Sequence, residues 1–236
     1  MINQIKADIK KQANPKKAKI YQRFFKTEKG EYGEGDIFIG LTGLEIKKIA
    51  KKYSNLSAKS VNKLLNSKIH EERSIALSIL IMQYNESNEE KKEKIFKYYL
   101  KNTKNINNWD LVDISAYKII GNFLLNNKKN KSILYHLAKS DNLWEKRISI
   151  ISTFAFIKDN QFKDSLKISE VLLKDKHDLI HKAVGWMLRE IGKKDLKTEE
   201  KFLKKHYRKM PRTMLRYAIE KFPEKKRQKY LKGKIK

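Results

Sequence analysis

The stretch HDLIHKAVGWMLREIGK, residues 177–193, has the pattern of an amphipathic α-helix. Its apolar residues recur three or four positions apart, which places them on one face of a helix. The apolar stripe consists of Ile180, Val184, Met187, Leu188 and Ile191. The opposite stripe, which we expect to face away from the core, consists of Lys182, Trp186, Arg189 and Lys193.

The same spacing continues through almost the whole chain and predicts an all-α protein. Only three prolines and nine glycines interrupt it, and IFIGL, residues 37–41, is the only strand candidate. GEYGEGD, residues 30–36, does not fit a dinucleotide-binding loop, because its three acidic residues would repel a phosphate. We read it as a connecting loop. The predicted helices span about 2–12, 16–26, 43–54, 57–67, 70–85, 89–101, 109–126, 130–139, 142–158, 162–174, 177–193, 197–208, 211–221 and 224–232.

The helical segments also repeat. HEERSIALSIL begins at His70 and WEKRISIISTF begins at Trp144, so that Arg73 and Arg147 lie two periods of about 37 residues apart. This period suits stacked pairs of antiparallel helices. We therefore expect residues 1–236 to form one domain, a HEAT-like or ARM-type α-α superhelix (a helical-repeat solenoid) with a concave basic groove. Residues 223–236 are expected to be a basic C-terminal tail with a frayed end.

The chain carries 55 Lys and Arg residues against 27 Asp and Glu residues, for a net charge of +28. Such an excess favours a polyanionic partner, although lysines that merely cover solvated faces would give the same composition. The absence of cysteine excludes disulfides and thiolate chemistry. The longest apolar stretches, such as IISTFAFI at 150–157, are too short to span a bilayer, so we expect a cytoplasmic protein without membrane contact.

The run NNWDLVD, residues 107–113, places Trp109 and Asp113 on one face of the predicted helix 109–126. This face is apolar, and a buried carboxylate there must be satisfied by a helix cap, an arginine or a cationic reactant. Arg147 lies on the apolar side of the predicted helix 142–158, one repeat further along. From spacing alone, a structural Asp113–Arg147 ion pair is the leading interpretation.

Metal binding is not expected. His177 and His181 have the i, i+4 spacing that can chelate zinc, but no further ligand completes a site. We read them as a solvated or capping pair at the start of a helix. No cofactor is predicted.

Three runs together, NNWDLVD at 107–113, LWEKRISI at 143–150 and HKAVGWMLREIGK at 181–193, resemble the AlkD-type DNA alkylation repair glycosylases, which are built from HEAT-like repeats. The resemblance covers residues 16–222. It implies a monomeric, monofunctional enzyme that hydrolyses the N-glycosidic bond of cationic alkylated purines, such as 3-methyladenine and 7-methylguanine, in double-stranded DNA.

The resemblance also implies roles for individual residues. Asp113 matches the catalytic carboxylate, and Trp109 and Trp186 match the tryptophans that line the cleft. Arg147 and Arg189 match DNA-binding arginines. The further residues expected at the DNA are Lys146, Lys182, Lys193 and, in a loosely aligned region, Phe24. The alternatives are a non-catalytic helical-repeat protein that binds DNA or RNA, and a protein-interaction scaffold.

Overall fold

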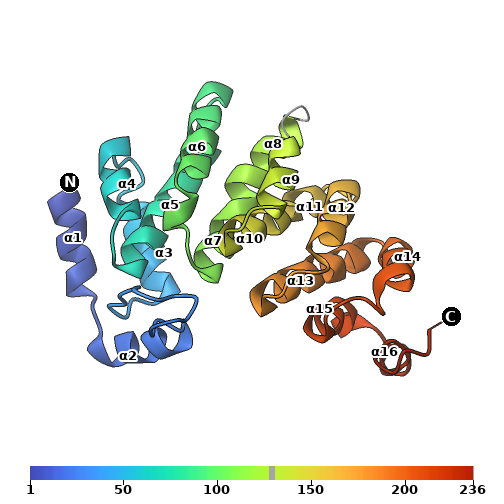
Figure 1. Ribbon diagram of the computed structural model, residues 1–236. Helices are drawn as coiled ribbons and strands as arrows, with labels where there is room; N and C mark the ends of the chain where they lie inside the picture. Colours follow the sequence, from blue (N-terminus) through green and yellow to red (C-terminus); the bar gives the residue numbers. More distant parts are fainter. Residues whose placement is uncertain (128–130, 236) are drawn as a thin grey trace. The chain divides into compact units, whose positions relative to one another are not determined.

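The computed structural model describes residues 1–127 and 131–235, which form helices joined by short connections (Figure 1). These residues divide into two compact units, Met1–Ser115 and Ala116–Lys236, and each is described by itself. The all-α prediction is confirmed. Within the described residues the strand candidate 37–41 contributes one isolated bridge, between Ile37 and Ile69. No helix in this part of the chain is long and apolar enough to cross a membrane.

The first unit contains seven helices among its described residues. Side chains cap several of their starts: Asn14 accepts a hydrogen bond from the Lys17 amide, and Thr42 and Glu45 form a reciprocal capping box. The helices are α1 (Ile2–Lys11), α2 (Pro15–Phe24), α3 (Gly43–Lys52), α4 (Ala58–Leu65), α5 (His70–Asn85), α6 (Glu89–Lys101) and α7 (Trp109–Ala116), with a 3₁₀ turn, η1, at Thr103–Asn105.

Helix α5 is the centre of this unit and packs against α3, α4 and α6. Most of its apolar residues are buried, and so are four polar residues in its first turn, His70, Glu71, Glu72 and Arg73. The Glu71 carboxylate accepts hydrogen bonds from the amides of residues 39–41, at 2.8–3.3 Å. A buried anion that receives several backbone N–H groups is well satisfied, and it holds the chain before α3 against α5.

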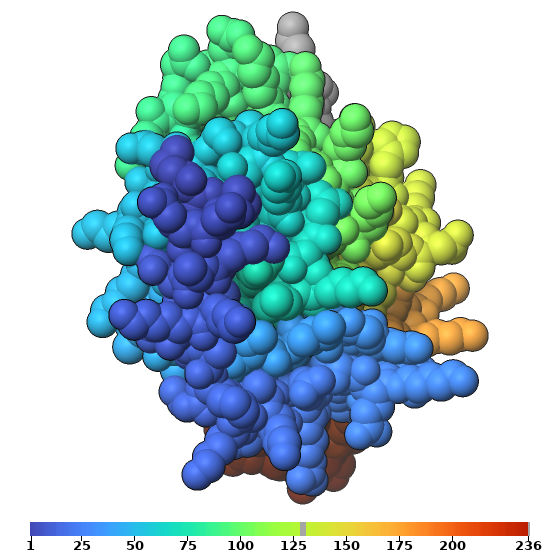
Figure 2. Space-filling view, turned by 90° about the vertical axis from the view of Figure 1, so that its left-hand side faces the viewer, coloured from blue at the N-terminus to red at the C-terminus, as the bar shows by residue number. Residues whose placement is uncertain are grey.

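Helix α1 lies on the surface of the first unit, where Figure 2 shows it in the darkest blue. It contacts α3. Ile5 and Ile9 are buried, while Asp8 accepts hydrogen bonds from Lys52 (2.6 Å) and from the Tyr53 hydroxyl (2.8 Å). One apolar face and one polar anchor therefore hold α1 in place.

The glycine-rich stretch 30–36 is a loop, as predicted. Gly30 and Gly35 have φ angles of +82° and +83°, a region that favours glycine. Two of the loop's acidic residues serve the loop itself, because Glu31 accepts from the Glu28 amide and Glu34 from the Gly30 amide. The acidic side chains therefore have a structural use that composition alone does not show.

The second unit is centred on α13, which packs against α10, α12, α14 and α15. A Cβ atom on Gly185 would lie 2.5 Å from the Met214 carbonyl oxygen and 2.5 Å from the Tyr217 Cβ, so this glycine permits the close approach of α13 and α15. The helices are α8 (Asn122–Asn126), α9 (Ser132–Ala138), α10 (Leu143–Ser152), α11 (Phe154–Lys158), α12 (Lys163–Leu172), α13 (Asp178–Lys194), α14 (Leu196–His206), α15 (Arg212–Ala218) and α16 (Glu224–Leu231), with a π-helical turn, η2, at Tyr117–Gly121 and a 3₁₀ turn, η4, at Ile219–Lys221.

Two long predicted helices are interrupted, so their continuity was predicted wrongly. The segment 109–126 contains the π-helical turn η2. The segment 142–158 breaks at Thr153, whose hydroxyl donates to the Ile150 carbonyl (2.7 Å) and lies 3.0 Å from the Ser165 hydroxyl. Threonine hydroxyls that bond to the preceding turn compete with the helix backbone. Residue 130, at the start of the predicted helix 130–139, lies outside the described residues.

The basic C-terminal segment is held more firmly than the expected frayed end, up to residue 235. The Lys234 amide donates to the Lys229 carbonyl (2.8 Å), and the Tyr207 hydroxyl lies within hydrogen-bond distance of the Gly233 and Ile235 carbonyls. The sequence suggested fraying because it is rich in lysine, and lysine-rich tails lack apolar anchors. Here the anchors are backbone carbonyls bound by a tyrosine.

Candidate functional site

Trp109 is the first residue of α7 and belongs to a column of stacked rings in the first unit. Its ring stacks on Phe25 at a centroid distance of 5.2 Å and an interplanar angle of 21°. Phe25 in turn stacks on Phe38 (4.8 Å, 13°), and Phe38 stacks on His70 (4.3 Å, 24°). Aromatic contacts of this kind hold ring orientation as well as burying area, so the Trp109 indole is fixed before any ligand arrives.

Phe24, the loosely aligned candidate, meets Trp109 edge to face at 6.0 Å. Its side chain is 63% exposed. The structure therefore brings together two residues that the sequence proposed separately, an exposed phenylalanine and the half-buried tryptophan beside it.

A buried ionic network anchors the start of α7 beneath this column. His70 Nε2 lies 2.8 Å from Asp110 Oδ2, and His70 Nδ1 lies 3.1 Å from Asp36 Oδ2. Arg73 donates to Asp36 Oδ1 at 2.7 Å. Asp110 is the second residue of α7, and so the network fixes the turn that carries Trp109.

The charge state of this network follows from its surroundings. Burial disfavours a charged imidazole, but the carboxylates of Asp110 and Asp36 outweigh it and raise the pKa of His70 to about 8. Burial likewise opposes ionisation of Asp36, yet His70 and Arg73 lower its pKa. At neutral pH an imidazolium therefore lies between two carboxylates, with both ring nitrogens donating.

Asp113 lies one turn after Trp109 on α7. Its side chain is only half-buried, whereas its neighbours Val112 and Ala116 on the same predicted stripe are fully buried. The pKa of Tyr99 is raised by burial, and the Asp113 charge adds to that shift, which identifies the buried Tyr99 as a neighbour of this carboxylate. Asp113 thus lies at the edge of the core.

In the second unit, the predicted apolar stripe of α13 is confirmed, because all five of its members are buried. Trp186, on the other stripe, is half-buried. Its ring is tilted against Phe154 (5.8 Å, 45°), and Phe154 also meets Tyr117 edge to face at 5.2 Å. Gly185, next to Trp186, is the residue that lets α15 approach.

An acidic residue lies among the cations around Trp186. Glu190 accepts a hydrogen bond from the indole N–H of Trp186 (3.1 Å) and another from Lys193 (2.6 Å). Arg189 pairs with Glu220 and also lies 3.5 Å from Glu190. Sequence reasoning missed Glu190, although its position four residues after Trp186 places it on the same helix face.

The other predicted DNA-contacting cations also have partners. Lys182 pairs with Asp178 (2.8 Å), and Lys146 pairs with Asp175 (2.9 Å). Arg147 is 5% exposed and donates to the Leu179 carbonyl at 2.5 Å. In the structure Arg147 therefore links α10 to the start of α13.

Of the two histidines at that start, His177 is a capping group, as predicted, and His181 contacts the backbone before the helix. His177 is the N-cap of α13 and its Nδ1 accepts from the Leu179 amide (3.2 Å), whereas His181 Nε2 lies 2.6 Å from the Asp175 carbonyl oxygen. Across residues 1–127 and 131–235, no group of three or more histidine and acidic side chains is arranged to hold a metal ion.

Comparison with known proteins places this geometry in a family. Residues 5–222 match the family model described as DNA alkylation repair enzyme. No curated protein matches. Three solved structures are similar in fold: a predicted DNA alkylation repair enzyme from Enterococcus faecalis (TM-score 0.70, 16% identity, 90% of this chain and 98% of that chain), AlkD2 from Streptococcus mutans (0.58, 19%, 86% and 98%), and smu.31 from Streptococcus mutans UA159 (0.55, 21%, 76% and 92%).

At these identities the solved structures support the fold alone, which is the AlkD-like helical repeat. The family model extends over most of the chain. By that match the chain belongs to the family of DNA alkylation repair enzymes.

Proposed function

We propose that this protein is a monofunctional DNA-alkylpurine N-glycosylase, which hydrolyses the bond between the sugar and a cationic alkylated purine such as 3-methyladenine or 7-methylguanine in double-stranded DNA. The observation that carries the proposal is the start of α7. There a half-buried carboxylate, Asp113, follows one turn after an indole, Trp109, whose orientation is held by stacked rings.

The chemistry needs little more than a well-placed negative charge. A purine alkylated at N3 or N7 is already cationic and leaves readily. As the bond breaks, positive charge develops on the sugar. The Asp113 carboxylate stabilises that charge and positions the attacking water. Because Asp113 is partly withdrawn from solvent, its charge acts more strongly than it would in bulk water.

Trp109 supports the same step through its electron-rich ring face, which attracts a cation. Its stack on Phe25 and the ionic anchor at Asp110 remove the freedom that an isolated indole would lose on binding. Phe24, exposed beside it, extends the aromatic surface toward solvent. We assign Trp186, held by Glu190 and Phe154, a similar aromatic contact with the DNA.

Binding of the phosphates is assigned to Lys146, Lys182, Arg189 and Lys193. In the structure each of these side chains is paired with an acidic residue, so a phosphate must compete with that partner. The pair of Lys182 with Asp178 is exposed, and exposed pairs are weak, about 0–1 kcal/mol, so a phosphate displaces this partner most readily. Arg147 is buried, and we propose that it supports this surface through the Leu179 carbonyl.

The second candidate function is a non-catalytic protein that binds DNA or RNA. It is favoured by the net charge of +28, which needs no catalytic carboxylate to attract a nucleic acid. The two functions separate in one experiment: purified protein is mixed with methylated duplex DNA, and the supernatant is analysed for free 3-methyladenine and 7-methylguanine. Released base supports the glycosylase. Stoichiometric DNA binding with no base above the no-protein control refutes it and leaves the binding protein.

A further inference from the structure

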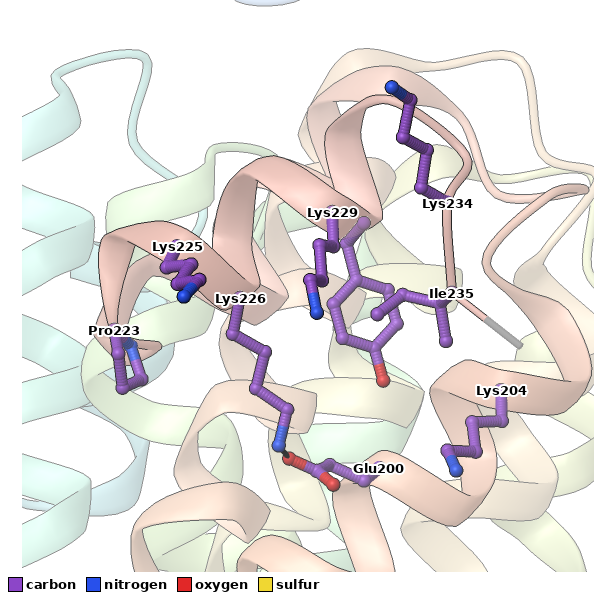
Figure 3. A pocket seen from close by; sticks show the side chains of 9 residues that line it. Glu200, Lys204, Pro223, Lys225, Lys226, Lys229, Lys234 and Ile235 are labelled. Atoms are coloured by element: carbon purple, nitrogen blue, oxygen red, sulfur yellow. Dashed lines mark hydrogen bonds and ion pairs between the residues drawn. The ribbon is translucent and has the colours of Figure 1, made fainter.

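The strongest unexplained feature of the second unit is a pocket of 610 Å³ between α14, α16 and the C-terminal segment (Figure 3). Its volume lies in the range of about 300–1,000 Å³ that is typical of small-molecule sites. Five lysines line it, against one acidic residue, Glu200. The lysines are Lys204, Lys225, Lys226, Lys229 and Lys234.

The lysines approach the pocket from different directions. Lys225, Lys226 and Lys229 extend from α16, while Lys204 comes from α14 on the other side. In Figure 3 the Lys229 ammonium points into the open space between the two helices, and Lys226 reaches across to Glu200, with which it forms an ion pair. Lys234 points away from the others.

The charge of this pocket is uncompensated, in contrast to the cations around Trp186. Among residues 1–127 and 131–235, Lys226 is the one pocket lysine with an acidic partner within 4 Å. Nearby ammonium groups repel one another, and folding is opposed unless an anion screens them. An anion bound in the pocket would therefore reduce the repulsion between these lysines.

A buried polar group that lines the pocket also lacks a hydrogen-bond partner. Tyr230 is 1% exposed, and its hydroxyl has no hydrogen-bond partner in the described part of the chain. A buried hydroxyl left unpaired costs about 1–3 kcal/mol. An acceptor oxygen brought into the pocket would offset part of that cost.

From these observations we propose that the pocket binds an oligophosphate, meaning two or more linked phosphate groups, carried either by a free small molecule or by the phosphorylated end of a nucleic-acid strand. Lysine binds phosphate as a point charge, without the planar geometry that arginine imposes. One phosphate carries about two charges at most, which is fewer than the three unpaired lysines that remain when Lys234, which points away, is left out. This site lies outside the residues of the proposed glycosylase chemistry and does not depend on that function.

The test is calorimetric titration of the full chain with inorganic tripolyphosphate and, separately, with orthophosphate. The double variant Lys204→Gln/Lys229→Gln removes two exposed pocket charges from α14 and α16. The matched control Lys47→Gln/Lys51→Gln removes two exposed charges from α3. Lys204→Arg/Lys229→Arg restores the charge.

We expect tripolyphosphate to bind at least tenfold more tightly than orthophosphate. Its affinity should fall at least tenfold in the Gln variant, remain within threefold in the control, and recover in the Arg variant. Equal losses in the Gln variant and the control, no loss in either, or equal affinity for the two anions would overturn the proposal. Thermal unfolding of each variant checks the fold.

A second pair of titrations distinguishes the two sources of phosphate. Single-stranded oligonucleotides of one sequence are compared with a 5′-triphosphate and with a 5′-hydroxyl. If the strand end is the ligand, the 5′-triphosphate adds affinity that the Gln variant loses. If the ligand is a free oligophosphate, the two oligonucleotides bind alike, while tripolyphosphate still distinguishes the variants. Neither result bears on whether the protein releases bases from methylated DNA.

Discussion

The ionic network under Trp109 makes the stability of the first unit depend on pH in a direction that the structure determines. The pKa of His70 is about 8 in the folded protein, against an ordinary value of 6.5. A shift of 1.5 units corresponds to about 2 kcal/mol, because one pKa unit is worth about 1.36 kcal/mol. Since the folded pKa is the higher one, this contribution is complete below pH 6.5 and is lost as the pH rises through 8.

The perturbation is His70→Gln, which removes the titrating group while keeping a side chain that can hydrogen-bond. Chemical denaturation of wild type and variant is followed between pH 6 and pH 9. The wild-type advantage should shrink by about 2 kcal/mol across this range. The comparison isolates His70, because other titrating groups contribute equally to both proteins when they lie far from it. NMR titration of the His70 ring measures its pKa directly.

Asp110→Asn serves as the companion variant, because it removes the carboxylate whose effect raises the pKa of His70 most. In that variant the pKa of His70 should fall substantially from about 8. A wild-type His70 pKa at or below 6.5, or an identical pH dependence in wild type and His70→Gln, would refute the reasoning.

Three further predictions concern buried groups. Burial raises the pKa of Glu199 to about 9, above its ordinary 4.5, so the stability contributed by the neutral carboxyl is complete below pH 4.5 and is lost as the pH rises through 9. Glu199→Gln, which stays neutral, should therefore raise the free energy of unfolding at pH 8 by at most about 5 kcal/mol, measured by urea denaturation, and no gain at pH 8 contradicts this. Gly185→Ala should lower that free energy by about 1–3 kcal/mol, because the added methyl meets the α15 backbone at 2.5 Å, and an unchanged denaturation midpoint would show that the helices adjust. Phe25→Leu should leave DNA affinity within threefold but slow base release several-fold, because Trp109 loses its stacking partner. An unchanged single-turnover rate would show that Phe25 does not position Trp109 for base release.

The sequence was sufficient for most of the helices, because their apolar spacing is regular. Helices 70–85 and 89–101 agree with α5 and α6 at both ends. The interruptions at η2 and at Thr153 were not predicted, because the apolar spacing of both segments continues across them. Whether a threonine hydroxyl bonds to its own helix backbone depends on the groups packed beside it, here the Ser165 hydroxyl next to Thr153.

The candidate site was predicted unevenly. Trp109 and Trp186 came from helix faces and a resemblance. The ionic network that holds the start of α7 joins residues 34–40 positions apart, such as His70 with Asp36 and Asp110, and no local pattern encodes that pairing. Of the pocket lysines, Lys225, Lys226, Lys229 and Lys234 fell in the predicted tail and Lys204 in the predicted helix 197–208, because a charge run shows its sign in the sequence but not whether acids neutralise it.

The central claim is that the charge of Asp113 lowers the barrier to base release, and single-turnover kinetics tests it most directly. Wild type, Asp113→Asn and the exposed control Asp159→Asn are each added in excess to duplex DNA that carries one 7-methylguanine. The account predicts that Asp113→Asn binds the DNA but releases the base about ten- to a thousandfold more slowly, equivalent to about 1.4–4 kcal/mol, while Asp159→Asn matches wild type. An Asp113→Asn rate equal to that of wild type, with the fold intact, would contradict it.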